Sequence, residues 1–347
     1  MPYSDLPESA FWARCRGTDD FLQDALFAPK FQLVPGMRVA TAGSCFAQNI
    51  GRHIKASDLE FVDTEPKPRL MPEDIAGRHG YGLFSARYGN VYTTTQLLQL
   101  LEDATGEALR DCAVWRKDGQ FYDALRPNVE PEGFADPAEL AVHRIDHLRR
   151  VRQIFENLDV FIFTLGLTEF WLDKETGTAF PTAPGVIAGD FDPAAHAFHN
   201  AGFAAVQADL RCAIGIMRQL SPRLKILLSV SPVPLTATAS GHHILRANTY
   251  SKSVLRAVAE EVAASDPDID YFPAFELISG TPYNTRHYAE NLRQVSPAGL
   301  QTVMTAFFAA YPQISFSSGA GDNEGVSIDE DVDDAICEDI MLDLFAE

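Results

Sequence analysis

Residues Met37 to Phe46 read Met-Arg-Val-Ala-Thr-Ala-Gly-Ser-Cys-Phe and join a short apolar segment to a turn of small residues. The segment 37–41 is mostly apolar and predicts a β-strand, and residues 46–59 after the turn predict a helix. A strand, a tight turn and a helix make up the first half of a βα unit. This unit sets the pattern for the rest of the chain.

Two longer apolar runs continue the pattern. Residues 160–165 (Val-Phe-Ile-Phe-Thr-Leu) and 225–230 (Lys-Ile-Leu-Leu-Ser-Val) are typical of parallel strands buried on both faces. A further strand is expected at 269–272, short strands near 114–115 and 121–122, and helices from about 94 and at 137–158, 203–220, 249–264 and 296–311. Residues 172–200 are expected to be a long excursion containing Gly and Pro. The alternation predicts an α/β fold with a doubly wound, mostly parallel sheet, helices on both faces and long inserted loops.

The chain of 347 residues is expected to have three parts. Residues 1–35 would form an N-terminal arm packed on the core, with aromatic anchors at Phe11, Trp12, Phe21, Phe27 and Phe31. Residues 36–314 would form the α/β domain. Residues 315–347 would be an acidic linker and a short amphipathic tail, since residues 322–347 hold eleven Asp and Glu and no Lys or Arg. The apolar face of the tail would dock on its own domain or on a protein partner.

Composition narrows the class of protein. The formal net charge is −20 and no basic stripe is present, so nucleic acid is not expected as a ligand. No apolar run approaches the roughly 18 residues of a membrane span. The N-terminus has no basic start or apolar segment typical of a secretory signal, and the five cysteines form no Cys-x-x-Cys pair. These features predict a cytoplasmic protein without a structural metal or a disulfide framework.

Three predicted strands end in residues that suit chemistry. They are followed by Gly43-Ser44-Cys45, by Gly166-Leu167-Thr168-Glu169 and by Ser231-Pro232-Val233. Sites in open α/β sheets form at the carboxyl ends of the strands. A thiol at a helix start is favoured as the thiolate, and the same backbone N–H groups can hold an oxyanion. Small residues at such turns also serve packing alone, so both interpretations stay open.

A set of motifs gives this chain a family resemblance. Gly43-Ser44-Cys45-Phe46-Ala47 matches the signature for which the GSCFA family is named. Further matches follow in order over about residues 37–312: Arg87-Tyr88-Gly89-Asn90-Val91-Tyr92, Thr164 to Trp171, Val230 to Leu235, Tyr250-Ser251-Lys252-Ser253 and Tyr271 to Glu276. The chain therefore resembles this family over most of its length.

The resemblance implies a fold and a site. The GSCFA family is similar to the SGNH/GDSL hydrolases, which implies a three-layer flavodoxin-like fold. Cys45 then falls at the nucleophile position and Ser44 at the position of the usual Asp. Gly43 and the Cys45 N–H would help to form the oxyanion hole. Residues 166–169 correspond to a Gly-x-Asn-Asp motif, in which Gly166 would contribute and Thr168 would donate in place of Asn.

The last block of the resemblance departs from the pattern. Related sequences carry Asp-x-x-His there, the acid and base of a triad. This chain has Asn291 and Gln294 at those positions, and neither side chain acts as a general base near neutral pH. The standard triad is therefore not present.

Other residues are candidates for the missing roles. His243, His242 and His287 are possible bases or substrate ligands, and a surface or structural role is the alternative for each. Glu169 would orient a base or hold a substrate hydroxyl, or else form a salt bridge or cap. Substrate contacts are also assigned to Asn90, Tyr92 and Asn291. Lys252 would bind an anion or pair with Glu276. No metal-ligand spacing and no nucleotide fingerprint is present.

Two functions follow from these residues. In the first, the protein is an esterase or O-acyltransferase that acts on an acylated carbohydrate or glycoconjugate through an acyl group on Cys45, with acyl-CoA as a conceivable donor. The glycan substrate is implied by the resemblance. In the second, the protein is a catalytically degenerate SGNH-like module that binds or scaffolds. Asn291 and Gln294 favour the second, and the acidic tail would then hold a protein partner.

Overall fold

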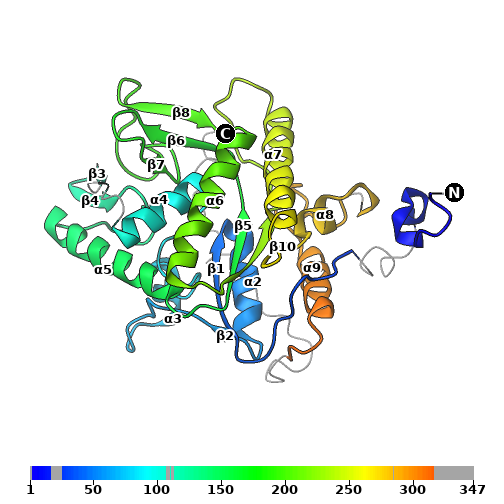
Figure 1. The fold of residues 1–347 in the computed structure, drawn as a ribbon. Coiled ribbons are helices and arrows are strands. Elements are labelled where there is room, and N and C mark those ends of the chain that lie inside the picture. Colours follow the sequence, from blue (N-terminus) through cyan, green and yellow to red (C-terminus); the bar gives the residue numbers. More distant parts are fainter. Residues whose placement is uncertain (1, 17–25, 107–109, 111–112, 284, 316–347) are drawn as a thin grey trace.

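The computed structural model describes residues 2–16, 26–106, 110, 113–283 and 285–315 (Figure 1). Its centre is a parallel sheet of five strands, in the spatial order β10–β9–β5–β1–β2. The strands are β1 (Arg38–Gly43), β2 (Glu60–Phe61), β5 (Val160–Leu165), β9 (Lys225–Val230) and β10 (Ile269–Tyr271). Counted along the chain within this sheet, the order is 2-1-3-4-5, the flavodoxin-like arrangement. The expected fold class is confirmed.

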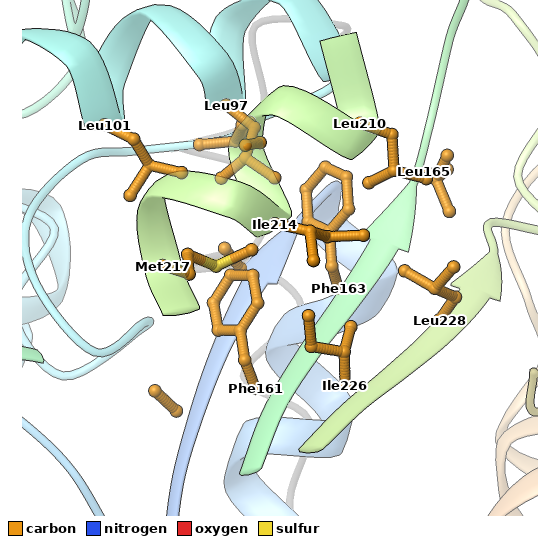
Figure 2. Packing of buried hydrophobic residues seen from close by; sticks show 14 of the residues in the cluster. Leu97, Leu101, Phe161, Phe163, Leu165, Leu210, Ile214, Met217, Ile226 and Leu228 are labelled. Atoms are coloured by element: carbon orange, nitrogen blue, oxygen red, sulfur yellow. The ribbon is translucent and has the colours of Figure 1, made fainter. Parts of the chain in front are cut away.

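Helices cover both faces of the sheet and complete three layers. One face carries α4 (Thr94–Thr105), α5 (Pro137–Phe155), α6 (Phe203–Leu220) and α7 (Ile244–Ala264), and the other carries α2 (Cys45–Lys55), α8 (Ala274–Ser279) and α9 (Pro297–Ala310). Alternate residues of β5 serve the two layers. Phe161 and Phe163 pack with α6 (Figure 2), whereas Val160 and Ile162 pack with the opposite layer. This two-sided burial explains the continuous apolar run.

Local capping sets where several helices begin. Thr93 and Gln96 form a capping box at the start of α4, and the Asp136 carboxylate accepts from the Ala138 N–H before α5. Helix α7 begins at Ile244, five residues before the expected start, because His243 caps it. The short helix α3 (Glu73–Arg78) lies in the connection from β2 to α4.

Residues 169–200 contain a second sheet that the sequence interpretation did not anticipate. Strands β6 (Glu169–Asp173), β7 (Ala179–Phe180) and β8 (His196–Asn200) form it in the order β7–β6–β8. The pairing is antiparallel, and it starts four residues after β5 ends. The two expected short strands form a hairpin, β3 (Val114–Lys117) with β4 (Gln120–Asp123). Figure 1 shows the second sheet at the end of the molecule where β5 points.

The N-terminal residues divide into two groups. Phe31 and Leu33 are buried and Phe27 packs beside them, in the core layer of α9. Phe11 and Trp12, in the short 3-10 segments Glu8–Ala10 and Trp12–Arg16 and the link between them, are exposed. Phe21 and the acidic tail lie outside the described residues. Within the described ranges, no helix is long and apolar enough to cross a membrane.

Candidate active site

At the turn between β1 and α2, the backbone of β1 comes very close to that of β5. Gly43 has a φ of +146°, and a Cβ at this position would lie 2.5 Å from the carbonyl oxygen of Thr164 on β5. Only glycine fits such an approach. Ser44 then occupies the N-cap of α2, where its side chain makes no capping hydrogen bond, and Cys45 is the first helical residue. The sequence thus places a half-buried thiol at the positive end of a helix dipole.

A small recess opens at this thiol, and we call it the Cys45 recess. The space that the centre of a water molecule can occupy in it is about 20 Å³, so the recess has room for about one water. The residues that line it come from five chain segments: Ser44, Cys45, Tyr92, Gly166, Leu167, Ser231, Val233, Pro234 and Lys252. All three predicted strand ends therefore meet at this point.

Tyr92 ties two of these strand ends together. Its hydroxyl lies 3.9 Å from the Cys45 Sγ. Its carbonyl oxygen accepts hydrogen bonds from the N–H groups of Gly166 (2.9 Å) and Leu167 (3.0 Å). The Gly166 N–H is therefore occupied, and the oxyanion role assigned to Gly166 would need this bond to break. The Tyr92 hydroxyl is instead a donor within reach of the thiol.

Lys252 brings an amino group to the Cys45 recess. Its side chain is buried, only 3% exposed, and its Nζ donates to the carbonyl oxygen of Gly166 at 2.8 Å. Among the described residues, Lys252 is the only Lys, Arg, Asp or Glu that lines the recess. Glu276, the expected ion-pair partner, instead accepts from Arg256 and from Tyr271. A charge so deeply buried favours a negative group nearby.

Lys252 occupies an unusual position for a charged residue. It lies on the buried face of α7, three residues before Leu255 and seven before Ala259, which are both buried. A lysine on the apolar stripe of an amphipathic helix breaks the expected pattern. This break in the pattern is the sequence feature that marks Lys252 as a candidate site residue. Its proximity to Cys45 depends on contacts between distant segments.

The Ser44 side chain adds a polar group to the recess. Its Oγ is buried and has no hydrogen-bond partner among the described residues. The neighbouring Ser231 Oγ accepts from the Val233 N–H at 3.3 Å. Ser44 therefore has an unsatisfied hydroxyl beside the thiol, which a bound ligand would satisfy.

Thr168 and Glu169 turn away from the recess, because they lead into β6. The Thr168 Oγ1 donates to the Asn200 side chain on β8 at 2.8 Å, and its N–H donates to the Ser251 Oγ. The Glu169 carboxylate accepts from the Thr238 hydroxyl at 3.0 Å. Burial raises the pKa of Glu169, and the bond from Thr238 opposes that rise. Neither side chain lines the Cys45 recess.

The three candidate histidines do not line the recess either. His242 and His243 are exposed, and the His243 Nδ1 accepts from the Leu245 N–H as the cap of α7. Lys252 lies nine positions after His243 along α7, roughly 13 Å along the helix axis. His287 is buried, with its Nδ1 2.7 Å from the Leu277 carbonyl oxygen and its Nε2 3.5 Å from the Thr302 hydroxyl.

Asn291 and Gln294, at the expected acid and base positions, bind each other. The Asn291 Nδ2 donates to the Gln294 Oε1 at 3.1 Å, and both residues are exposed. Asn90 is buried and its Oδ1 accepts from Gln48 at 3.4 Å, away from the Cys45 recess. In the ranges that the structure covers, no cluster of three His, Cys, Asp or Glu side chains could hold a metal ion.

A comparison with family models agrees with the motifs. The GSCFA family model matches residues 38–307. Among solved structures, a carbohydrate esterase family 3 from Talaromyces cellulolyticus is 10% identical with a TM-score of 0.36, and the match covers 78% of this chain and 94% of that one. An acetyl esterase mutant with acetate ion is 10% identical with a TM-score of 0.31, covering 78% and 93%. A search of curated proteins gives no match.

Proposed function

This chain belongs to the GSCFA family, and we propose that it is an acyl-group enzyme whose nucleophile is Cys45. One observation carries the proposal: a half-buried thiol at a helix start shares a recess with the buried amino group of Lys252. The helix dipole and the ammonium both favour the thiolate over the thiol. A thiolate needs no Asp-His pair to become nucleophilic, so the loss of that pair at Asn291 and Gln294 is tolerated.

Lys252 can carry the proton through both halves of the reaction. The Cys45 thiolate attacks the ester carbonyl carbon, and the oxygen takes the electron pair. Collapse of this intermediate breaks the ester C–O bond, and the leaving oxygen takes a proton from the Lys252 ammonium. The neutral Lys252 amine then removes a proton from the incoming hydroxyl, which attacks the thioester. Release of the thiolate restores the starting ion pair.

The carbonyl oxygen needs donors while it is negative. Tyr92 is a side-chain donor at the site, with its hydroxyl 3.9 Å from the Sγ. The first N–H groups of a helix have no partner within the helix, so the start of α2 supplies backbone donors beside the same atom. These groups take the place of the Gly166 N–H, which Tyr92 occupies.

We further propose an acylated carbohydrate or glycoconjugate as substrate, on the basis of the family resemblance to carbohydrate O-acyl enzymes. The acceptor is water in an esterase and a sugar hydroxyl in an O-acyltransferase, and acyl-CoA is then a suitable donor. Product analysis separates these reactions. Free acid accumulates in hydrolysis, whereas transfer consumes the acceptor sugar and releases the donor alcohol or thiol.

Trapping of the acyl group tests the nucleophile. We expect wild-type protein mixed with p-nitrophenyl acetate and quenched early to carry one acetyl group on the peptide containing Cys45, as read by mass spectrometry. Cys45→Ala should lack this group and turn over no faster than buffer. Equal turnover by wild type and Cys45→Ala, without acetylation at residue 45, would refute the proposal.

A binding module is the second candidate. It is favoured by Asn291 and Gln294, which hold each other at 3.1 Å on an exposed loop instead of reaching Cys45. Under this alternative the Cys45 recess is a packing detail and no acyl group is trapped. A protein that binds acylated glycans equally well as wild type and as Cys45→Ala, without consuming them, would support it.

A further inference from the structure

A larger cavity lies next to the Cys45 recess, and we call it the side cavity. Its volume for the centre of a water molecule is about 230 Å³. It is lined by β6, β8 and two loops, through Leu167, Glu169, Phe170, Trp171, residues 181–183, Phe198 and residues 235–239. Leu167 lines both spaces, so they are neighbours. Figure 1 shows β6 and β8 at the end of the sheet where β5 points.

We infer that the side cavity binds the sugar ring of an O-acylated saccharide and presents the ester of that ring to Cys45. This inference rests on the proposed function and adds to it the subsite that would hold the sugar. The ring would be held by the aromatic wall and by the polar groups of β6 and its neighbouring loops.

The aromatic wall suits the C–H face of a sugar. Trp171 is half-buried and packs edge-to-face against Phe191 (5.0 Å between ring centroids) and Phe198 (5.7 Å). These contacts hold the indole in one orientation, so the side chain loses little conformational entropy when a ligand binds. The π face of an aromatic ring carries negative charge density and attracts the C–H groups of a pyranose.

Three polar side chains in the wall of the cavity have unused hydrogen-bonding capacity. Both bonds to the Glu169 carboxylate reach Oε1, from Thr238 at 3.0 Å and from Asn200 at 3.4 Å. Among the described residues nothing donates to Oε2. The hydroxyls of Thr182 and Thr236, which also belong to the wall, are buried without a partner within the same ranges.

This polarity selects against an acyl chain as the occupant. An alkyl chain would displace water from the Glu169 carboxylate and supply no donor in return, which costs free energy. Ring hydroxyls supply donors to Oε2 and acceptors to the threonines. Sites built to bind a hydroxyl discriminate strongly against ligands that lack it.

Relative specificity tests the inference if the enzyme turns over. The two substrates are acetylated methyl glucopyranoside and p-nitrophenyl acetate, which has no sugar. We expect Glu169→Gln to lower the ratio of their kcat/KM values at least tenfold, mainly through the KM of the glycoside. The matched control is Glu175→Gln, an exposed acid in the turn after β6, which should leave the ratio unchanged. Equal ratios in the two variants would overturn the inference.

Direct binding separates this inference from the proposed function. The probes are the methyl glycosides of glucose, galactose and mannose, and N-acetylglucosamine, added to Cys45→Ser and observed by saturation-transfer NMR. We expect at least one to bind and to lose its signal in the double variant with Glu169→Gln. If none binds, the subsite is refuted even when p-nitrophenyl acetate acylates Cys45. If p-nitrophenyl hexanoate is favoured over the acetate and Glu169→Gln increases that preference, the cavity holds the acyl chain and the inference is again overturned.

Discussion

Gly43 is the residue on which the geometry of the turn most depends. Its φ of +146° and the 2.5 Å approach of a Cβ to the Thr164 oxygen leave no room for a side chain. The next two residues, Ser44 and Cys45, are positioned by that turn. The signature is therefore a packing requirement followed by a thiol, and the two parts can be tested separately.

Gly43→Ala should destabilise the fold by about 3 kcal/mol or more, because the added methyl group must displace β5 or strain the turn. Thermal unfolding measures the change. The control is Gly215→Ala in the exposed part of α6, where an added Cβ meets nothing within 4 Å. That variant should gain about 0.5–1 kcal/mol through helix propensity. Equal melting temperatures for the two variants would contradict the close approach at Gly43.

The residues of the site were only partly predictable. Gly43 and Cys45 lie at the junction of a strand and a helix, so the local sequence pattern predicts their positions. Tyr92 and Lys252 reach the same recess from segments about 50 and 200 residues away, and no local pattern encodes that meeting. Thr168 and Glu169 were assigned to the recess because β6 was not anticipated, and the strand carries both away from it.

At the scale of elements, an ion network joins α5 to α4 and the β3–β4 hairpin. Arg144 of α5 donates to Asp103 at 2.8 Å and to Asp123 at 3.2 Å, and all three side chains are buried. On the same helix the His147 Nδ1 lies 2.8 Å from the Glu65 carboxylate. These contacts tie α5 to α4, to the hairpin and to Glu65, whose carboxylate also accepts from the Arg87 N–H at 2.8 Å.

His147 should make stability depend on pH. Burial, together with the nearby charge of Arg126, lowers the pKa of His147 to about 4 against the opposing effect of Glu65. In the unfolded chain this imidazole is therefore protonated below about pH 6.5, whereas in the folded chain it is protonated only below about pH 4. Stability from this group is complete above pH 6.5 and falls by on the order of 3 kcal/mol as the pH drops to 4.

Denaturant unfolding at pH 7, 5.5 and 4 measures this loss. His147→Gln should remove most of the decrease between pH 6.5 and 4 while lowering stability at pH 7. The exposed His243→Gln is the control and should keep the wild-type pH dependence. A wild-type stability that stays constant over that interval would contradict a buried neutral His147.

Element types were predicted well where burial is continuous and poorly where it is not. Strands β5 and β9 and helix α6 begin and end where the apolar patterns do. The second sheet was not predicted because β8 reads His-Ala-Phe-His-Asn and β7 has only two residues. Neither segment shows the alternation of apolar and polar residues that is typical of a strand. Their pairing with β6 comes from tertiary context, which overrides weak local preference.

At the scale of the whole molecule, the N-terminal segment completes the core. The Lys30 N–H donates to the Asp270 carboxylate at 2.7 Å, and its Nζ donates to the Ile269 carbonyl oxygen at 2.9 Å. Phe31 and Leu33 then insert beside α9. The packed part of the arm is thus residues 27–33, next to the edge strand β10.

Two truncations test this division. Removal of residues 1–25 should leave the melting temperature within a few degrees of wild type, since no described residue in that range belongs to a core cluster. Removal of residues 1–35 should cost at least about 4 kcal/mol, because the buried Phe31 and Leu33 side chains are lost. Calorimetry measures both. Equal stability of the two truncated proteins would show that the segment does not support the core.

The ion pair of Cys45 and Lys252 is the central claim, and the pH dependence of iodoacetamide alkylation tests it most directly. Rates at Cys45 and at the exposed Cys212 of the same protein are read by mass spectrometry. We predict an apparent pKa for Cys45 below the roughly 8.5 of free cysteine, a rise of about one unit or more in Lys252→Met, and the wild-type value in Lys252→Arg and His243→Ala. If Cys45 titrates like Cys212 in wild type and Lys252→Met changes nothing, the thiol is not activated and the account is contradicted.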